Sequence, residues 1–143
     1  MLIPAAWGIV LAVTVTVVAR LVGFDRDRAL YPIALLVIAS YYELFAVLGG
    51  TRSALAEEMI VFALFASAAV IGFRTSLWIV AAALAAHGLF DLFLHHEIIA
   101  NRGVPLWWPA FCSSYDVTAG GCLAMLLRLG VIPARAAADP GAG

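Results

Sequence analysis

Charge is scarce in this sequence of 143 residues: only 12% of them are charged, about half the share that soluble domains carry. Lysine is absent, and eight arginines against nine acids give a net charge of −1. With 65% hydrophobic residues, the chain has too little polar surface to cover a water-soluble core. It also lacks the excess of basic residues with which proteins bind nucleic acid. These shortages exclude a soluble globule and a nucleic-acid-binding protein, and they favour a small protein embedded in a lipid bilayer.

Cysteine is nearly absent as well, with only Cys112 and Cys122. We expect the first in a loop and the second in a helix, beyond the roughly 7 Å that a disulfide can span between Cα atoms. Arginine without lysine, in a chain rich in Ala, Gly and Val, is typical of a GC-rich genome. A bacterial source is therefore expected, with the inner membrane as the location.

Long apolar stretches are what the sequence does have. A helix that crosses the hydrocarbon needs about 20 apolar residues, and clusters of charge, Gly and Pro mark the breaks. The sequence predicts an all-α bundle of five transmembrane helices, which lie at residues 3–21, 30–48, 54–73, 77–100 and 115–132. Residues 1–133 are expected to form this single domain. The small, polar tail at 134–143 is predicted to be disordered and cytoplasmic.

The first apolar stretch is predicted to be a retained helix and not a signal peptide. It lacks a basic segment before it, and it is longer than the 7–15 apolar residues usual in signal peptides. With five crossings, six arginines fall on one side and two on the other. The two groups are Arg20, Arg26, Arg28, Arg74, Arg128 and Arg135, against Arg52 and Arg102. By the positive-inside rule the N-terminus is outside and the C-terminus is cytoplasmic.

Ionisable residues inside the predicted helices cost roughly 2.5–3.5 kcal/mol each, so each needs a partner or a purpose. They are Glu43, Glu57, Glu58, His87, Asp91, His95, His96, Glu97 and Asp116. Counted at 1.5 Å per residue, all of them lie in the outer half of the bilayer. We predict that Glu43, Asp91, His95 and Asp116 converge in one outer pocket. Only one of the adjacent Glu57 and Glu58 can face the bundle interior.

The pattern HxxxDxxxHH is the strongest single feature of the sequence. On one helix His87, Asp91 and His95 form a single stripe, with its ends about 12 Å apart. Because a Zn–N bond is about 2.0–2.1 Å, both histidines cannot comfortably bind one ion. A divalent metal such as zinc would take Asp91 with one histidine, first His95 and otherwise His87. Glu43 and Asp116 lie at a suitable depth to complete the site, as a further ligand or as the catalytic base.

Two other interpretations of these residues stay open. They can form a hydrogen-bond network that only fixes helix packing, or a proton or ion relay in a transporter element or a subunit of a larger complex. The inner half of the predicted bundle holds no titratable group apart from terminal arginines. This one-sidedness favours a site open to the outer face, either a metal-dependent enzyme acting on a lipid or periplasmic substrate, or a site for a lipid or small molecule. The sequence decides neither enzymatic activity nor homo-oligomerisation.

The segment that follows the HxxxD pattern holds Trp107 and Trp108 between two prolines. The prolines stiffen a predicted hairpin and place both rings at the level of the lipid headgroups. An aromatic belt explains this arrangement, and a lid over the polar pocket is the alternative.

Residues His87 to Asp116, HGLFDLFLHHEIIANRGVPLWWPAFCSSYD, resemble small bacterial integral-membrane proteins in which an HxxxDxxxHH helix precedes a VPxWWPxFCxxYD loop. The likeness covers about a fifth of the chain and implies no activity. It implies that one set of residues belongs together, namely His87, Asp91, His95, Trp107, Trp108, Cys112 and Asp116. The ligand chemistry is also similar to that of membrane-embedded zinc hydrolases of the alkaline ceramidase type, although the spacing differs and a separate HxxxH is missing.

Overall fold

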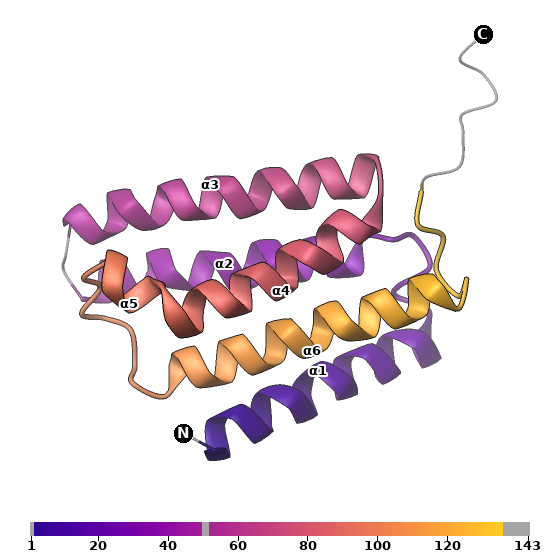
Figure 1. Ribbon diagram of the computed structural model, residues 1–143, viewed down its shortest axis with the longest axis horizontal. Coiled ribbons are helices and arrows are strands. Elements are labelled where there is room, and N and C mark those ends of the chain that lie inside the picture. Colours follow the sequence, from indigo (N-terminus) through magenta and orange to yellow (C-terminus); the bar gives the residue numbers. More distant parts are fainter. Residues whose placement is uncertain (1, 50–51, 136–143) are drawn as a thin grey trace, which may run out of the picture.

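The structure, a computed structural model, describes residues 2–49 and 52–135 and consists of helices joined by short connections (Figure 1). The helices are α1 (Leu2–Val22), α2 (Leu30–Leu48), α3 (Arg52–Arg74), α4 (Leu77–Phe93), α5 (His95–Ile98) and α6 (Trp108–Arg128). No strand occurs within these described ranges. The predicted all-α class is therefore confirmed for this part of the chain.

Four of the helices, α1, α2, α3 and α6, are long and apolar enough to cross a membrane. Helix α4 is also apolar but has 17 residues, which extend about 26 Å against a hydrocarbon thickness of about 30 Å. Large apolar side chains are exposed along the outer faces of the bundle, including Val17, Ile60, Leu64 and Met125. An apolar exterior of this extent is compatible with a protein surrounded by lipid.

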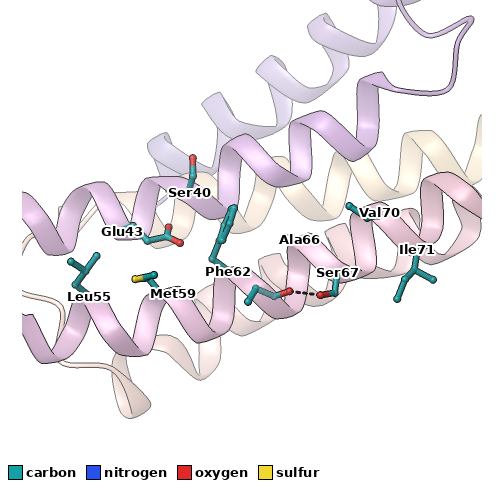
Figure 2. Close-up of a pocket in the computed structure, with 10 residues that line it drawn as sticks. Ser40, Glu43, Leu55, Met59, Phe62, Ala66, Ser67, Val70 and Ile71 are labelled. Atoms are coloured by element: carbon teal, nitrogen blue, oxygen red, sulfur yellow. Dashed lines mark hydrogen bonds between the residues drawn. The ribbon is translucent and has the colours of Figure 1, made fainter.

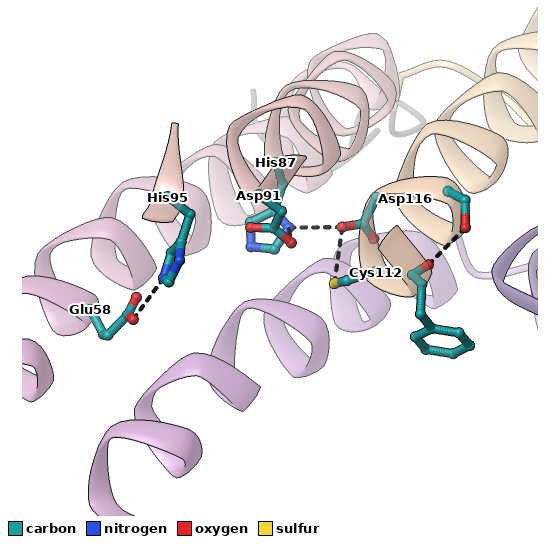
Figure 3. Close-up of polar contacts among 8 residues, drawn as sticks. Glu58, His87, Asp91, His95, Cys112 and Asp116 are labelled. Carbon is teal, nitrogen blue, oxygen red and sulfur yellow. Dashed lines mark hydrogen bonds and ion pairs between the residues drawn. The ribbon is translucent and has the colours of Figure 1, made fainter. Parts of the chain in front are cut away.

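The predicted fourth helix at 77–100 is wrong at its C-terminal end, because α4 ends at Phe93. Leu94 adopts φ −116° and ψ −34°, and the chain then makes only the single turn of α5. The interruption separates His95 from the continuous stripe expected for it. Its side chain lies instead beside α3, where it finds a carboxylate partner (Figure 3).

The predicted fifth helix at 115–132 is wrong at both ends, because α6 begins at Trp108 and ends at Arg128. Pro109 stands in the first turn, where a missing N–H costs no helical hydrogen bond. Gly130 adopts φ +67° just beyond the other end, a conformation that suits glycine after a helix. Cys112 is therefore helical and not in a loop. Asp116 lies about 12 Å inside the helix instead of at its boundary.

Helix α4 lies in the middle of the bundle, in contact with α2, α3 and α6, and α6 in turn packs on α1 (Figure 1). Glycine lets α4 and α6 approach closely. A Cβ atom on Gly88 would lie 2.7 Å from the Ser113 carbonyl oxygen, and one on Gly120 would lie 2.8 Å from that of Ala81. Small residues of this kind allow close helix packing in membranes, where little hydrophobic force drives helices together.

The interior of the bundle is divided along its length. Leu77, Leu84 and Leu123 are fully buried in the half that contains the α3–α4 connection. Apart from Asp25 in the α1–α2 connection, the buried acids and histidines of the described chain lie in the other half, towards α5; they are Glu58, His87, Asp91, His95 and Asp116. The two groups of buried carboxylates and imidazoles within the helices thus lie at the end of the bundle opposite the apolar core.

At the apolar end, Arg28 holds the segment that follows α6. It adopts φ 69° and is buried, and its guanidinium donates to the carbonyls of Pro133 and Ala134, each at 3.1 Å. The tail predicted to be disordered at 134–143 thus begins with a residue bonded to the bundle. Residues 136–143 lie outside the described residues.

We expect Gly88→Ala to lower the free energy of unfolding by about 1–3 kcal/mol, because the new methyl group overpacks α4 against α6. Denaturant unfolding in detergent micelles measures the loss. Gly121→Ala is the matched control, since nothing lies within 4 Å of a Cβ at this position. There the better helix propensity of alanine should leave stability unchanged or raised by up to about 1 kcal/mol. Equal losses in the two variants would contradict the close α4–α6 packing.

Candidate metal centre

Four buried side chains from two helices meet at one point: His87 and Asp91 of α4, and Cys112 and Asp116 of α6 (Figure 3). We call them the His-Asp-Cys-Asp cluster. The members of each pair are four residues apart, so one helical turn places both on the same face. None is more than 2% exposed. Each offers a ligand-type atom, and these atoms all lie within 4.8 Å of one another.

The Oδ2 atom of Asp116 is the centre of the polar contacts in this cluster. It lies 2.8 Å from Nδ1 of His87 and 3.6 Å from Sγ of Cys112. The same Nδ1 atom is 3.5 Å from Oδ2 of Asp91. With its proton on Nδ1, His87 donates to Asp116, and the Cys112 thiol donates to the same oxygen. The imidazole therefore lies between two carboxylates.

The carboxylates of the cluster are not satisfied by these contacts. Both oxygens of Asp91 and Oδ1 of Asp116 are buried without a hydrogen-bond partner. Two carboxylates beside one imidazole leave excess negative charge even when the imidazole is protonated. Buried charges in an apolar interior are paired or bind metal ions, because desolvation is otherwise too costly. A divalent cation matches both the charge and the unpartnered oxygens.

The donor set fits a first-row transition metal, zinc in particular. Zinc binds Cys sulfur at about 2.3 Å, His nitrogen at about 2.0–2.1 Å and carboxylate oxygen at about 2.0–2.2 Å. In a tetrahedral site with such bonds, neighbouring ligand atoms lie about 3.3–3.8 Å apart. The cluster has separations from 2.8 Å up to 4.8 Å, so small side-chain shifts suffice to reach that geometry. Four protein ligands would fill a tetrahedral site.

A second buried cluster consists of Glu58, His95 and Asn101. Nε2 of His95 lies 2.8 Å from Oε1 of Glu58, and Nδ2 of Asn101 donates to the same oxygen at 2.8 Å. Asn101 also donates to the Tyr42 carbonyl at 3.0 Å. This Glu58–His95–Asn101 cluster joins α2, α3, α5 and the following loop. Glu58 is thus the glutamate that faces the interior, while Glu57 is exposed.

Tyr42 of α2 lies between the two clusters. Its ring centroid is 4.3 Å from that of His95 and 6.1 Å from that of His87. Its buried hydroxyl interacts with the Asp91 carboxylate. The two clusters are therefore neighbours, separated by one aromatic ring.

The other residues predicted for the site lie elsewhere. Glu43 lines a groove between α2 and α3, and no hydrogen bond or ion pair within the described chain joins it to either cluster. Trp108 packs against Tyr41 and Phe45 of α2, with ring centroids 5.0 Å and 4.9 Å apart, and Trp107 is half exposed. The structure therefore brings Asp91 and Asp116 together, as predicted, but places His95 and Glu43 outside their cluster.

Reasoning from spacing missed Cys112 as a member of the His-Asp-Cys-Asp cluster, together with Glu58 and Asn101 as partners of His95. The signal for Cys112 was its distance of four residues from Asp116, the same as that between His87 and Asp91. This signal becomes visible once Pro109 is taken as the start of a helix and not as part of a hairpin.

Comparisons of this chain with protein-family models, with curated proteins and with solved structures found no match. The resemblance of residues 87–116 to small bacterial membrane proteins therefore stays a prediction. The function is argued below from geometry and chemistry.

Glu58→Leu should lower the free energy of unfolding by about 1–3 kcal/mol, because it leaves the buried donors of His95 and Asn101 without an acceptor. Thermal unfolding in micelles, followed by circular dichroism, tests this. Glu57→Leu makes the same chemical change at the exposed neighbouring position and should be nearly neutral. A Glu57→Leu variant as unstable as Glu58→Leu would be evidence against the inward role of Glu58.

Proposed function

We propose that this chain is an integral-membrane protein that binds one divalent transition-metal ion, with zinc as the first candidate, in the His-Asp-Cys-Asp cluster. The observation that carries the proposal is four ligand-type atoms within 4.8 Å of one another, with three carboxylate oxygens that accept no hydrogen bond, although one of them, Oδ2 of Asp91, lies 3.5 Å from Nδ1 of His87. A purely structural network should satisfy such oxygens, as buried polar groups in proteins almost always are. The cluster instead leaves unused the atoms that a cation needs.

The proposed activity is that of a metal-dependent enzyme acting on a lipid-soluble substrate. Cys112 and Tyr115 line a mostly apolar cavity of about 550 Å³ between α1, α2 and α6. Trp107 and Trp108 line the same cavity and are the substrate-facing residues of this proposal. A bound metal polarises a carbonyl oxygen or activates water. Asp91 and Asp116 are the candidates for two roles: one carboxylate would help to hold the ion, and the other would accept the proton of the activated water.

A proton relay is the second candidate, and the position of Tyr42 favours it. Asp91, Tyr42 and His95 form a row of protonatable groups that leads to a second cavity, lined by His95 and Asn101. The helices of the apolar half contain no Asp, Glu or His among the described residues. A relay through this row would serve one end of the bundle only, so the enzyme is the first choice.

Five membrane crossings, with the N-terminus outside and the C-terminus in the cytoplasm of a bacterial cell, complete the proposal. Arg20, Arg74 and Arg128 stand in the last turns of α1, α3 and α6. These three turns lie at the end of the bundle opposite α5 (Figure 1). The positive-inside rule supports a cytoplasmic location for that end. Both clusters would then lie in the outer half of the bilayer.

Reporter fusions test this orientation. A reporter that is active only outside the cytoplasm should be inactive at the C-terminus and active after Arg102, in the loop between α5 and α6. A fluorescent protein that matures only in the cytoplasm should give the opposite pattern. Activity of the first reporter at the C-terminus would overturn the proposed topology.

Protein purified without chelator should contain about one zinc or similar ion per chain, measured by inductively coupled plasma mass spectrometry. Asp91→Asn and Cys112→Ser each remove one ligand with little change in size, and we expect the metal content to fall at least about tenfold. His95→Ala is the control, because His95 lies in the Glu58–His95–Asn101 cluster, and it should keep its metal. If the wild type contains no metal and chelator leaves its melting temperature unchanged, the metal proposal is excluded. A proton relay or a packing network then remains as the interpretation of the cluster.

A further inference from the structure

Glu43 is an ionisable group of α2 that belongs to neither cluster. It lies five residues before the end of α2 at Leu48, about 7 Å along the helix axis. It lines a groove of about 910 Å³ between α2 and α3 (Figure 2). Figure 2 shows its carboxylate between the two helices, beside Met59 and Phe62.

The groove itself contains no basic side chain to pair with Glu43, whose carboxylate is acted on by the opposed charges of His87 and Glu58 in the neighbouring clusters. Among the described residues that line the groove, none is Arg, Lys or His. Oε2 of Glu43 is buried without a hydrogen-bond partner. The two serines of the groove donate to their own helices, Ser40 to the Val37 carbonyl and Ser67 to the Ala63 carbonyl, each at 2.7 Å. The groove therefore presents one acid with an unsatisfied oxygen among mostly apolar walls.

The shape of the groove adds a second constraint on what it can hold. Its wall on α3 runs from Leu55 to Ile71, which is about 24 Å along the helix axis. Glu43 lies near the Leu55 end, and beyond Phe62 the wall is formed mainly by small and aliphatic side chains. A complementary ligand has a positive head and a long, narrow apolar tail.

We propose that the α2–α3 groove is a binding site for a lipophilic amine, a molecule with an ammonium head and a single alkyl tail. The ammonium pairs with Glu43 and donates to its free Oε2 atom, which removes the cost of an unpaired carboxylate in an apolar medium. The tail lies along Ala63 and Ala66. A neutral lipid of the same shape gives no such charge pairing. Among the described residues, the groove shares no lining residue with the metal centre.

The test compares dodecylamine with dodecanol, which has the same alkyl tail without the charge. The full-length protein is placed in nanodiscs of zwitterionic lipid at neutral pH, where an alkylamine is protonated. Binding of each radiolabelled probe is measured against empty nanodiscs. Wild type should bind dodecylamine about tenfold or more tightly than dodecanol. Glu43→Gln should lose most of this preference, and Glu43→Asp should keep part of it.

A second pair of variants probes the groove with Glu43 left in place. Ala63→Trp fills the groove and should reduce dodecylamine binding at least about tenfold, whereas Leu64→Trp adds the same ring at an exposed position outside the groove and should not. Circular dichroism and melting temperature confirm that each variant is folded. Equal dodecylamine binding by wild type and Glu43→Gln would overturn the proposal. A second result would also overturn it: no dodecylamine binding by the wild type, together with a wild-type oligomer that separates into monomers in the Glu43→Gln variant. A second copy of the chain would then occupy the groove.

Discussion

The close contact of α4 with α6 is the constraint on which the polar interior depends. Each helix carries two ligand-type side chains one turn apart, and neither pair alone makes a site. Gly88 stands between His87 and Asp91 in the sequence, and a Cβ there would lie 3.0 Å from the Cβ of Asp116. The residue that lets the backbones approach is thus the one that brings the two pairs within reach. Packing and site geometry have the same cause.

The cost of burying a carboxylate in an apolar bundle is compensated to a different degree at three places in this chain. Glu58 is compensated within the protein, because His95 and Asn101 both contact its Oε1 atom at hydrogen-bond distance. Asp91 and Asp116 are compensated in part, because His87 lies between them while three of their oxygens accept no hydrogen bond. Glu43 has no charged partner in its groove. Compensation from within the protein decreases from Glu58 to the aspartate pair to Glu43. A partner from outside the chain is therefore needed more at each step, a metal ion for the aspartates and a lipophilic amine for Glu43.

The sequence predicts the helices that lie within uniform apolar stretches, since α2 begins and ends as expected at Leu30 and Leu48. It fails where the backbone changes direction between residues 93 and 108. Apolar periodicity continues across Leu94, so the pattern contains no sign that the chain breaks there to pair His95 with Glu58. The start of α6 was predictable from Pro109, whose role at a helix N-terminus competes with its role in turns. Placing Pro109 in a turn puts Cys112 in a loop, whereas placing Pro109 at a helix start puts Cys112 on the same helix face as Asp116.

Cys112 would also decide how a metal ion held by this cluster could be reached by a substrate. A tetrahedral ion held by four side chains has no position for water or substrate, as in structural zinc sites. Of the four residues, Cys112 lines the apolar cavity beside Trp108 and Tyr115, and its sulfur makes the longest contact with Asp116, at 3.6 Å. If the cluster holds an ion, Cys112 is therefore the residue of the four that a molecule in the apolar cavity would contact. His87, Asp91 and Asp116, one imidazole and two carboxylates, would then be the residues that hold the ion, which would supply a Lewis acid or an activated water.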